Sequence, residues 1–520
     1  MSIELSEQEI VRRAKLQEIT KMGIDPYPAE LVEINATAKD ILENFTPEKT
    51  EEYKNISIAG RVMSVRDMGK ACFVSLQDAT GRIQLYIRRD DICPAEDKSI
   101  FDLLFKKHTD IGDIIGITGF VFVTKVGETS IHVTSFKMLS KALRPLPVVK
   151  RDEQGNAFDE VTDPEFRYRQ RYVDLIINPK VKDTFVKRTQ MVNTIREFLN
   201  VQGALEVDTP VLQAIPGGAA ARPFTTHHNA LDIPMYLRIA NELYLKRLIV
   251  GGFDWVYEFS RNFRNEGMDR THNPEFTILE WYTAYKDYNW MMEITEQLLE
   301  KIALALHGTT DVKVGENVIS FKAPFKRVSI YDAIKENTGV ENIDKMNEEE
   351  LRTVCKQLHI DVDPNIGKGK LVDEIFGAKA EGKFIQPTFI TDYPIEMSPL
   401  TKKHRSKPGL VERFELMVNG KELANAYSEL NDPIDQRERF EEQTKLMERG
   451  DDEAMFIDHD FLRALEYGMP PTAGIGIGID RLAMIMTNSA SIQDVLFFPQ
   501  LRPERANVTE AESVNTEKKD

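Results

Sequence analysis

Apolar and polar residues alternate in five short segments between residues 55 and 140. Alternation with a period of two predicts half-buried strands, and the glycines and aspartates between the segments favour turns. The segments read ISIAGRVMSV, ACFVSLQD, RIQLYIRR, DIIGITGFVFVT and TSIHVTSFKML. Five successive strands of this length predict a small five-stranded Greek-key β-barrel of the OB type.

Apolar residues at helical spacing predict an amphipathic helix near the N-terminus, which begins at the capping box SEQE and ends at Gly23. We expect Arg12, Arg13 and Lys15 on its exposed face, where they either contact RNA or are solvated charges. A second long helix is predicted over residues 181–200, after the barrel segment.

The chain divides into several parts. A single hydrophobic core stops growing at roughly 250–300 residues, so a chain of 520 residues predicts at least two domains. The last residues are polar and lack aromatics, which predicts disorder. The predicted parts are an N-terminal helical extension (1–50), the barrel (51–145), a proline- and charge-rich linker (146–180), a large domain in which strands and helices alternate (181–505) with a charge-rich helical insertion at about 335–385, and the tail (506–520).

Composition indicates the cellular compartment in which we expect the protein. No apolar run approaches the roughly 20 residues that a membrane helix needs, and the charged segment MSIELSEQEIVRRAKLQEI lacks the apolar core of a secretory signal. The three cysteines, Cys72, Cys93 and Cys355, are too widely spaced to indicate a zinc site or a disulfide framework. We therefore expect a soluble protein of the reducing cytoplasm that does not contact a membrane.

Charge is distributed unevenly along the chain. The net charge is −17, whereas residues 51–150 contain 15 Lys and Arg against 12 Asp and Glu. This contrast favours a specific contact between the barrel and a polyanion over indiscriminate binding of nucleic acid. Arg66, Phe73 and Gln84, one on each of the first three predicted strands, offer a cation, a stacking ring and an amide to single-stranded nucleic acid. The alternative interpretation makes Phe73 part of the core and Arg66 a surface charge.

Arginines within apolar segments of the large domain indicate a phosphate site, because unpaired charge in such surroundings is costly. In FRNEG followed by HNPEF, a strand, a turn and a returning strand would bring Arg264 and His272 to the same polyphosphate. Phe276 would then be able to stack on a purine. Arginine suits this role because its planar guanidinium binds phosphate oxygens bidentately.

Two further segments add a glycine-rich strand and a pair of acids. Alternate glycines in GIGIGIDR, which ends at Arg481, clear one strand face for a flat ring, although their spacing does not match a Rossmann fingerprint. Glu415 and Glu422 flank a turn predicted at Asn419-Gly420. Two carboxylates together with triphosphate oxygens are suitable ligands for Mg²⁺. The alternative for these acids is a solvated hairpin without a ligand.

Taken together, the segments resemble class II aminoacyl-tRNA synthetases. RNFRNEG…HNPEFT is similar to motif 2, GIGIGIDR to motif 3, and the long helix with ALEVDTP to motif 1, the dimer-forming element with its hallmark Pro210. A barrel before these motifs is typical of the subgroup for lysine, aspartate and asparagine. Within it, IPGGAAARPF, THHNALDIPMYLRIANELYLKRL, TDYPIEMSPL and NAYSELNDPIDQRERF resemble the bacterial-type lysyl-tRNA synthetases. The resemblance spans about residues 5–500 and implies an α+β fold, with an OB-type anticodon-binding domain and a catalytic antiparallel sheet flanked by helices.

The resemblance also implies roles for individual residues. For ATP it implies Arg264, Glu266, His272, Asn273, Phe276, Glu415 and Arg481, of which Arg264, Glu266, His272 and Arg481 act in catalysis; for Mg²⁺, with more than one ion expected, it implies Glu415 and Glu422. For lysine it implies Gly218, Glu242, Glu280, Tyr282, Asn425, Tyr427 and Glu429, and for the anticodon Arg66, Phe73, Gln84 and Glu128. The chemistry favours lysine independently, because an ammonium group needs buried carboxylates whereas an aspartate side chain would need a cation.

The implied reaction joins L-lysine to tRNA(Lys) at the expense of ATP, through a lysyl-adenylate, in a homodimer. Three alternatives remain. Ligation of aspartate or asparagine on the same fold is disfavoured by the acidic residues. A non-catalytic relative that only binds RNA is disfavoured by the arginines and metal-binding carboxylates, and an enzyme that lysylates a protein would normally lack the barrel.

Overall fold

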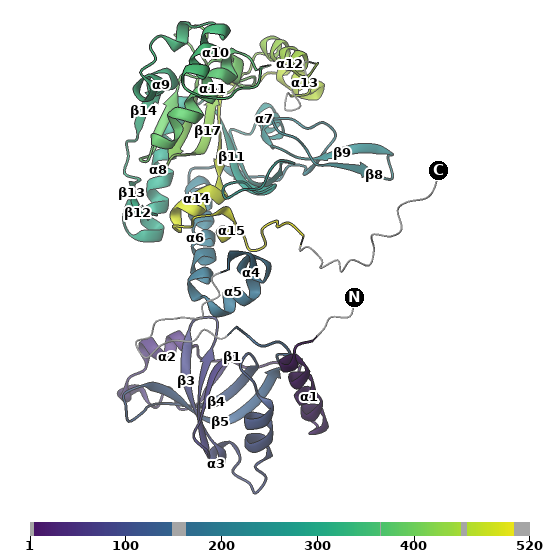
Figure 1. Cartoon of the computed structure of the whole chain (residues 1–520), viewed down its shortest axis with the longest axis vertical. Coiled ribbons are helices and arrows are strands. Elements are labelled where there is room, and N and C mark those ends of the chain that lie inside the picture. The colour runs from purple at the N-terminus through teal and green to yellow at the C-terminus, as the bar shows by residue number, and fades with distance from the viewer. Residues whose placement is uncertain (1–4, 148–162, 365, 449–454, 504–520) are drawn as a thin grey trace. The chain divides into compact units, whose positions relative to one another are not determined.

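The structure is a computed structural model that describes residues 5–147, 163–364, 366–448 and 455–503 (Figure 1). The chain folds into two compact units, Met1–Val161 and Thr162–Asp520. The predicted tail, 506–520, and residues 148–162 of the predicted linker lie outside the described residues.

The first unit is built on a closed barrel with the strand order β1-β2-β3-β5-β4. β3 and β5 are parallel, and the other neighbouring strands are antiparallel. Alternate residues face inward: in β2, Cys72, Val74 and Leu76 are buried while the residues between them are partly exposed. The predicted OB-type barrel is confirmed. Its strands are β1 (Ile56–Asp67), β2 (Ala71–Gln77), β3 (Arg82–Arg88), β4 (Ile114–Val123) and β5 (Thr129–Ser140).

The N-terminal helix begins at the predicted capping box, but the expectation that its basic residues are exposed is wrong for Arg12. The Arg12 guanidinium is buried and donates hydrogen bonds to the main-chain oxygens of Ile111 (2.9 Å) and Ala142 (3.0 Å). Lys15 forms an ion pair with Asp110 (2.6 Å). These cations therefore attach the helix to the barrel unit. The helices of this unit are α1 (Glu7–Lys21), α2 (Ala38–Asn44), α3 (Arg89–Ile92), a 3₁₀ turn η1 (Pro47–Lys49) and a π-helix η2 (Ile100–His108).

An eight-stranded sheet organises the second unit, with the order β14-β15-β16-β17-β18-β11-β10-β6. Neighbours from β15 to β10 are antiparallel, and the pairs β14–β15 and β10–β6 at the two edges are parallel. The strands are β6 (Leu205–Glu206), β10 (Trp255–Phe263), β11 (Glu275–Ala284), β14 (Lys326–Ser329), β15 (Thr388–Thr391), β16 (Arg413–Val418), β17 (Lys421–Ser428) and β18 (Thr472–Gly478).

Helices pack against both faces of this sheet. In β11, Leu279 and Trp281 join the core beneath α6 and α8, whereas Tyr282 joins a second cluster with α7 and α13. None of the described helices is long and apolar enough to cross a membrane. The remaining elements are α6 (Pro179–Val201), α7 (Glu242–Val250), α8 (Tyr288–His307), α12 (Pro433–Glu448), α13 (His459–Glu466), α14 (Ile479–Met486), α15 (Ile492–Val495), and the short strands β7 (Leu212–Gln213), β8 (Thr225–His228), β9 (Ile233–Leu237), β12 (Asp311–Val314) and β13 (Asn317–Ser320).

A helical segment connects β14 to β15. Parallel neighbours cannot be joined by a tight hairpin, and the connection here carries α9 (Ile330–Thr338), α10 (Glu348–Gln357) and α11 (Lys368–Lys379), with short 3₁₀ turns η3 (Ile343–Lys345) and η4 (Glu381–Lys383). These helices form a hydrophobic cluster of their own, which extends to the edge of the sheet. The predicted insertion near 335–385 falls within this connection.

The second half of the segment predicted as a linker forms two helices, α4 (Pro164–Arg169) and α5 (Arg171–Ile177). Arg171 is fully buried, forms an ion pair with Asp174 (2.6 Å) and donates to the main-chain oxygen of Gln493 (2.7 Å). This segment is therefore packed into the second unit.

Candidate active site

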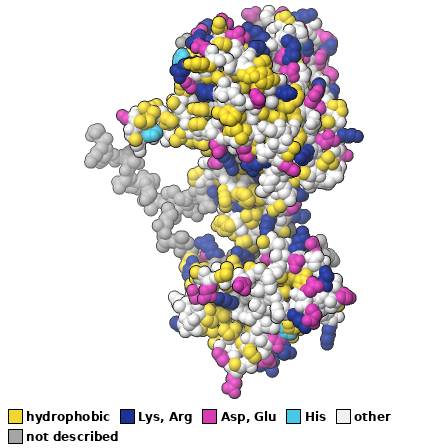
Figure 2. Space-filling model, turned by 180° about the vertical axis from the view of Figure 1, so that it is seen from behind, with side chains coloured by type: hydrophobic (Ala, Val, Ile, Leu, Met, Phe, Trp, Pro, Cys, Tyr) yellow, Lys and Arg dark blue, Asp and Glu magenta, His cyan; other side chains and the backbone are white. Residues whose placement is uncertain are grey.

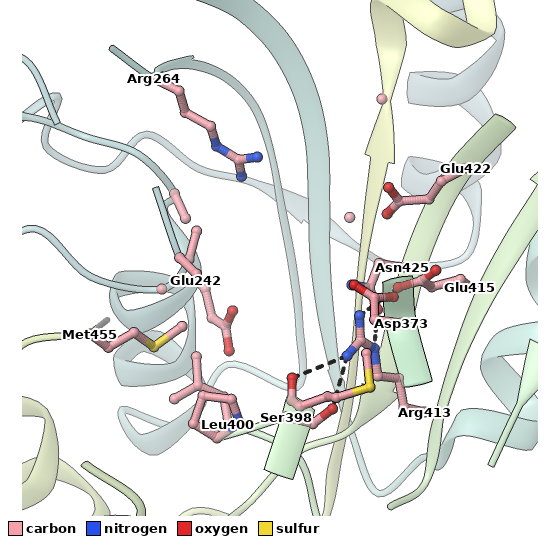
Figure 3. A pocket seen from close by; sticks show the side chains of 18 of the residues that line it. Glu242, Arg264, Asp373, Ser398, Leu400, Arg413, Glu415, Glu422, Asn425 and Met455 are labelled. Carbon is pink, nitrogen blue, oxygen red and sulfur yellow. Dashed lines mark hydrogen bonds and ion pairs between the residues drawn. The ribbon is translucent and has the colours of Figure 1, made fainter. Parts of the chain in front are cut away.

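A cavity of about 1300 Å³ lies over β11, β17 and β18 (Figure 3). The strand register places Tyr282 of β11 and Tyr427 of β17 on either side of Gly474, and Glu280 and Asn425 in the same way around the next glycine, Gly476. The middle strand thus has glycines where its neighbours have functional side chains. The missing side chains leave room for a ligand between the two rows.

The cavity collects the residues that the sequence predicted for ATP, lysine and metal. Among them only Glu429 does not line the cavity, and its buried carboxylate lies against the Gly474 position. The lining residues are Gly218, Glu242, Arg264, Glu266, His272, Asn273, Phe276, Glu280, Tyr282, Glu415, Glu422, Asn425, Tyr427 and Arg481.

One end of the cavity is cationic. The Arg264 guanidinium carbon lies 5.1 Å from the centre of the Phe276 ring, and its buried Nε has no hydrogen-bond partner among the described residues. Burial lowers the pKa of Arg264, although Glu266 and Glu422 nearby oppose this shift. A desolvated, incompletely paired guanidinium beside an aromatic ring is suited to a phosphate and a flat base.

His272 and Arg481 form a second polar group at this end. Arg481 donates to His272 Nε2 (3.1 Å), and His272 Nδ1 lies 2.8 Å from Asp269. Because an arginine only donates, this network assigns the ring proton of His272 to Nδ1. Arg481 also donates to the main-chain oxygen of Glu422 (2.7 Å). The predicted Asn273 is buried and braces the loop by donating to the main-chain oxygen of Glu275 (2.6 Å), whereas Glu266 is exposed on the loop after β10.

The two predicted metal ligands belong to the β16–β17 hairpin. Its turn residues Asn419 and Gly420 both have positive φ, 53° and 72°, as the predicted two-residue turn requires. A β-bulge follows, since Leu416 pairs with Ala424 whereas the next residue, Met417, pairs with Glu422. Bulges redirect side chains, and this one brings Glu422 to the same cavity as the odd-numbered residues of β17.

The chemistry of these carboxylates fits a magnesium ion. Glu415 Oε1 pairs with Arg413 (2.5 Å) and its Oε2 accepts a hydrogen bond from Tyr393 (2.8 Å). Burial raises the pKa of Glu415 to about 7, with Glu422 and Asp373 adding to the shift and Arg413 opposing it. The described residues contain no cluster of three or more His, Cys, Asp or Glu side chains placed to hold a metal. Magnesium often takes only one or two carboxylates and completes its shell with phosphates and water, so this pair suits an ion that binds together with ATP.

The other end of the cavity is acidic. Glu242, Glu280 and Glu429 are 5%, 5% and 2% exposed. The Tyr427 hydroxyl lies 2.8 Å from both carboxylate oxygens of Glu242, and the Tyr282 hydroxyl donates to Glu280 (3.2 Å). Three carboxylates this deeply buried need cations or protons.

The pKa values of Glu280 and Glu429 are raised, which indicates that their charged forms are under-compensated. Burial raises the pKa of Glu280 to about 8, and Glu242 adds to that shift. Burial also raises the pKa of Glu429 far above its ordinary value. Glu429 Oε1 has no hydrogen-bond partner among the described residues. An ammonium donor from a ligand would satisfy this oxygen and restore the charged forms of the acids.

Some site residues were not predicted from the sequence. Lys246 contacts Glu242 and Glu429. Arg413 pairs with Glu415, and Asp373 of α11 lines the cavity near this pair (Figure 3). Two of these had a local signal: Lys246 lies one helical turn after Glu242, and Arg413 precedes Glu415 by two residues on the same strand face. Asp373 had none, because its position depends on how the helical connection packs.

The predicted anticodon residues lie on the barrel. Phe73 alternates with the buried Cys72 and Val74, so it points to the outer face and the core-filling alternative is wrong. The Arg66 guanidinium carbon lies 4.9 Å from the centre of the Phe73 ring. Gln84, two strands from Arg66, donates to Ser130 (2.9 Å). Glu128 is exposed in the β4–β5 turn. The first two are thus neighbours, while Glu128 has no described contact with them.

Comparison with known families agrees with this architecture. A family model for tRNA synthetases of class II (D, K and N) matches residues 163–502, and a model for the OB-fold nucleic acid binding domain matches residues 56–139. Together with the cavity, these matches define a class II tRNA synthetase with an OB-fold domain.

Curated relatives specify the family further. The lysine–tRNA ligase of Porphyromonas gingivalis is 66% identical over 97% of this chain and 87% of its own length. That of Christiangramia forsetii is 66% identical over 97% and 88%, and that of Azobacteroides pseudotrichonymphae is 62% identical over 96% and 99%. The chain belongs to the lysine–tRNA ligase family.

Proposed function

We propose that this protein activates L-lysine with ATP and transfers the lysyl group to the 3′ end of tRNA(Lys), with release of AMP and diphosphate. The observation that carries the proposal is a single cavity with a cationic end at Arg264 and a buried acidic end at Glu429, whose Oε1 has no partner among the described residues. ATP and lysine would occupy the two ends, with the reacting atoms between them.

In the lysine subsite, Glu280, Tyr282 and Glu429 bind the side-chain ammonium. Gly218, Glu242 and Asn425 position the α-amino and carboxylate groups. Gly218 suits this approach, since its φ is 86° and a Cβ there would lie 3.2 Å from the Cβ of Glu242. Ligation of aspartate is disfavoured because that side chain would need a cation, and the ammonium of Lys246 at this end is already engaged by two carboxylates.

In the ATP subsite, Phe276 stacks on the purine and Arg264 binds the α-phosphate. The substrate carboxylate attacks that phosphorus atom, and diphosphate leaves with the electrons of the broken P–O bond. Arg264 stabilises the charge that develops at the transferring phosphate, and Arg481 with His272 orients the leaving diphosphate. Magnesium bound by Glu415 and Glu422, with more than one ion expected, would supply charge neutralisation at the phosphates.

In the second step, the terminal 3′-hydroxyl of the tRNA attacks the carbonyl carbon of the lysyl-adenylate, and AMP leaves. The barrel would read the anticodon by stacking a base on Phe73, with Arg66, Gln84 and Glu128 contacting base edges or the backbone. The two tasks are thereby separated, since charging needs both units whereas adenylate formation needs only the second.

We also propose that the protein acts as a homodimer. Support comes from exposed apolar residues on and beside the small sheet β7-β9-β8, where Leu212 is 47% exposed and Leu231 63%. Hydrophobic side chains also gather on the arm that projects from the second unit (Figure 2). Contiguous exposed apolar side chains are typical of protein interfaces. Sedimentation of the purified protein tests this part separately.

The decisive experiment is ATP–diphosphate exchange with magnesium, measured without tRNA across the twenty standard amino acids. Exchange only with lysine supports the proposed substrate. Exchange with aspartate or asparagine would overturn the assignment of the acidic end, and the absence of exchange with any amino acid would favour a non-catalytic role.

A further inference from the structure

Lys246 is a fully buried lysine of the protein itself at the acidic end of the cavity. It lies on α7, one turn after Glu242, and its side chain is 0% exposed. Its Nζ is 2.5 Å from Glu242 Oε1 and also contacts Glu429 Oε2. The same Nζ lies 5.6 Å from the centre of the Tyr427 ring and 5.9 Å from that of Phe461.

Burying an ammonium group is costly unless carboxylates compensate for the lost water. Lys246 uses as partners two of the acids that we assign to the substrate, Glu242 and Glu429. The contact occupies one oxygen of Glu429 and leaves Oε1 unpartnered among the described residues. Lys246 is thus a fixed cation that pairs with two ligand-binding carboxylates, Glu242 and Glu429. The second oxygen of Glu429, Oε1, stays available to a ligand.

The balance of charge shows what remains for a ligand. Three buried carboxylates, Glu242, Glu280 and Glu429, face a single buried ammonium among the described residues, that of Lys246. When all three acids are ionised, two negative charges lack a cation at this end, and L-lysine has two ammonium groups. The carboxylate of the substrate does not enter this balance, because it faces the cationic end at Arg264.

We propose that Lys246 is a positioning residue that sets the charge of the lysine subsite: it fixes Glu242 and Glu429 and leaves two carboxylate charges for the two ammonium groups of the substrate. This inference rests on the proposed lysine subsite. It explains why a buried lysine is retained in a pocket for lysine, where a neutral residue would leave a third acid without a cation.

Several groups face Lys246 and take part in its electrostatics. Nearby negative charges raise the pKa of Lys246 against the effect of burial, so it stays charged. Glu242 on the same helix and Glu429 just after β17 are the charges that act on Lys246, and the ring of Tyr427 on β17 lies near its Nζ. Glu280 and Tyr282 on β11 interact with Glu429, and Arg264 interacts with Glu280.

The test is Lys246→Met in the full chain, assayed by lysine-dependent ATP–diphosphate exchange between about pH 6.5 and 9. Methionine keeps the length of the side chain and removes its charge. We expect the KM for lysine to rise by about tenfold or more, because breaking a buried pair leaves a carboxylate uncompensated. The KM for ATP should stay within about twofold. In the parent the lysine KM should decrease as pH rises. In Lys246→Met this decrease should occur at higher pH, because loss of a neighbouring cation raises carboxylate pKa values.

Two further variants control this experiment. Lys246→Arg keeps the charge and should retain the pH profile of the parent, even if its larger head group weakens binding. Lys301→Met removes an ammonium from the surface helix α8, where the side chain is 42% exposed, and should leave every parameter unchanged.

Three results would overturn the inference: an unchanged lysine KM in Lys246→Met, a proportional loss of lysine and ATP binding without a shift in the pH profile, or an alkaline shift in Lys246→Arg. The last result remains informative if Lys246→Met does not fold. A parent protein that shows no exchange with lysine would instead refute the proposed function. The two failures are thus distinguishable.

Discussion

Substitution of Gly474 by alanine tests whether the glycine strand shapes the lysine subsite. A Cβ built at Gly474 would overlap Glu429 Oε1 and the ring of Tyr282. The backbone cannot easily move away, because β18 is hydrogen-bonded to β11 on one side and to β17 on the other. The two side chains must therefore shift, and both belong to the proposed ammonium site.

The size of the effect follows from what the shift removes. A hydrogen bond to a charged group contributes about 1.5–3 kcal/mol, and each 1.4 kcal/mol is a factor of about ten. Loss of the contact from Glu429 should thus raise the lysine KM by roughly 10- to 100-fold. Overpacking should also lower the free energy of unfolding by about 1–3 kcal/mol, whereas the KM for ATP should change little.

The assay is ATP–diphosphate exchange with lysine and ATP varied in turn, accompanied by denaturant unfolding. Gly476→Ala provides a graded comparison, because a Cβ there would lie 3.1 Å from Ile278 Cδ1, the flexible end of a side chain. Its effect on the lysine KM should be clearly smaller. A Gly474→Ala protein with the lysine KM of the parent would refute the reasoning.

The remaining predictions concern pH, phosphate and RNA. Because the pKa of Glu280 is raised to about 8 and only its ionised form pairs with an ammonium, lysine binding should release a proton and the lysine KM should fall as pH rises towards 8; Glu280→Gln should weaken this dependence in exchange assays. Arg264→Ala should lower exchange by about 100-fold or more, by loss of a transition-state contact, while the sedimentation of the protein stays unchanged; normal exchange would contradict its role. Phe73→Ala should raise the tRNA KM for charging, because it removes a stacking contact that contributes about 1–3 kcal/mol to tRNA binding. It should leave tRNA-independent exchange intact.

Local patterns allowed the elements to be predicted. The barrel strands, the capping box of α1 and the turn at Asn419-Gly420 each depend on a few neighbouring residues. The outward, partly exposed position of Phe73 agrees with the same period of two. By contrast, the burial of Arg12 depends on acceptors about a hundred residues away, such as the main-chain oxygen of Ile111, and helical spacing carries no information about them.

The candidate residues of the site could be chosen from the sequence, but the contacts between them could not. The recognised segments contain residues that the fold brings to one cavity, but the hydrogen bond between Tyr427 and Glu242 joins positions 185 residues apart. The bulge that turns Glu422 towards the cavity is a feature of strand pairing. The pairing of Lys246 with Glu429 is of the same kind, since only its contact with Glu242 lies within one helix.

The positions of the site residues along β11 bear on how the two proposed substrates are oriented towards each other. Residues two apart on a strand face the same side, so Phe276, Glu280 and Tyr282 of β11 share the cavity face. At roughly 3.3 Å per residue, the backbone of the strand spans about 20 Å from Phe276, proposed for the purine, to Tyr282, proposed for the ammonium. A lysine bound at Tyr282 must therefore extend its carboxylate towards the phosphate bound at Arg264. Under the proposed function, the acidic end would select the substrate by charge, and the length of the strand would place its carboxylate for attack.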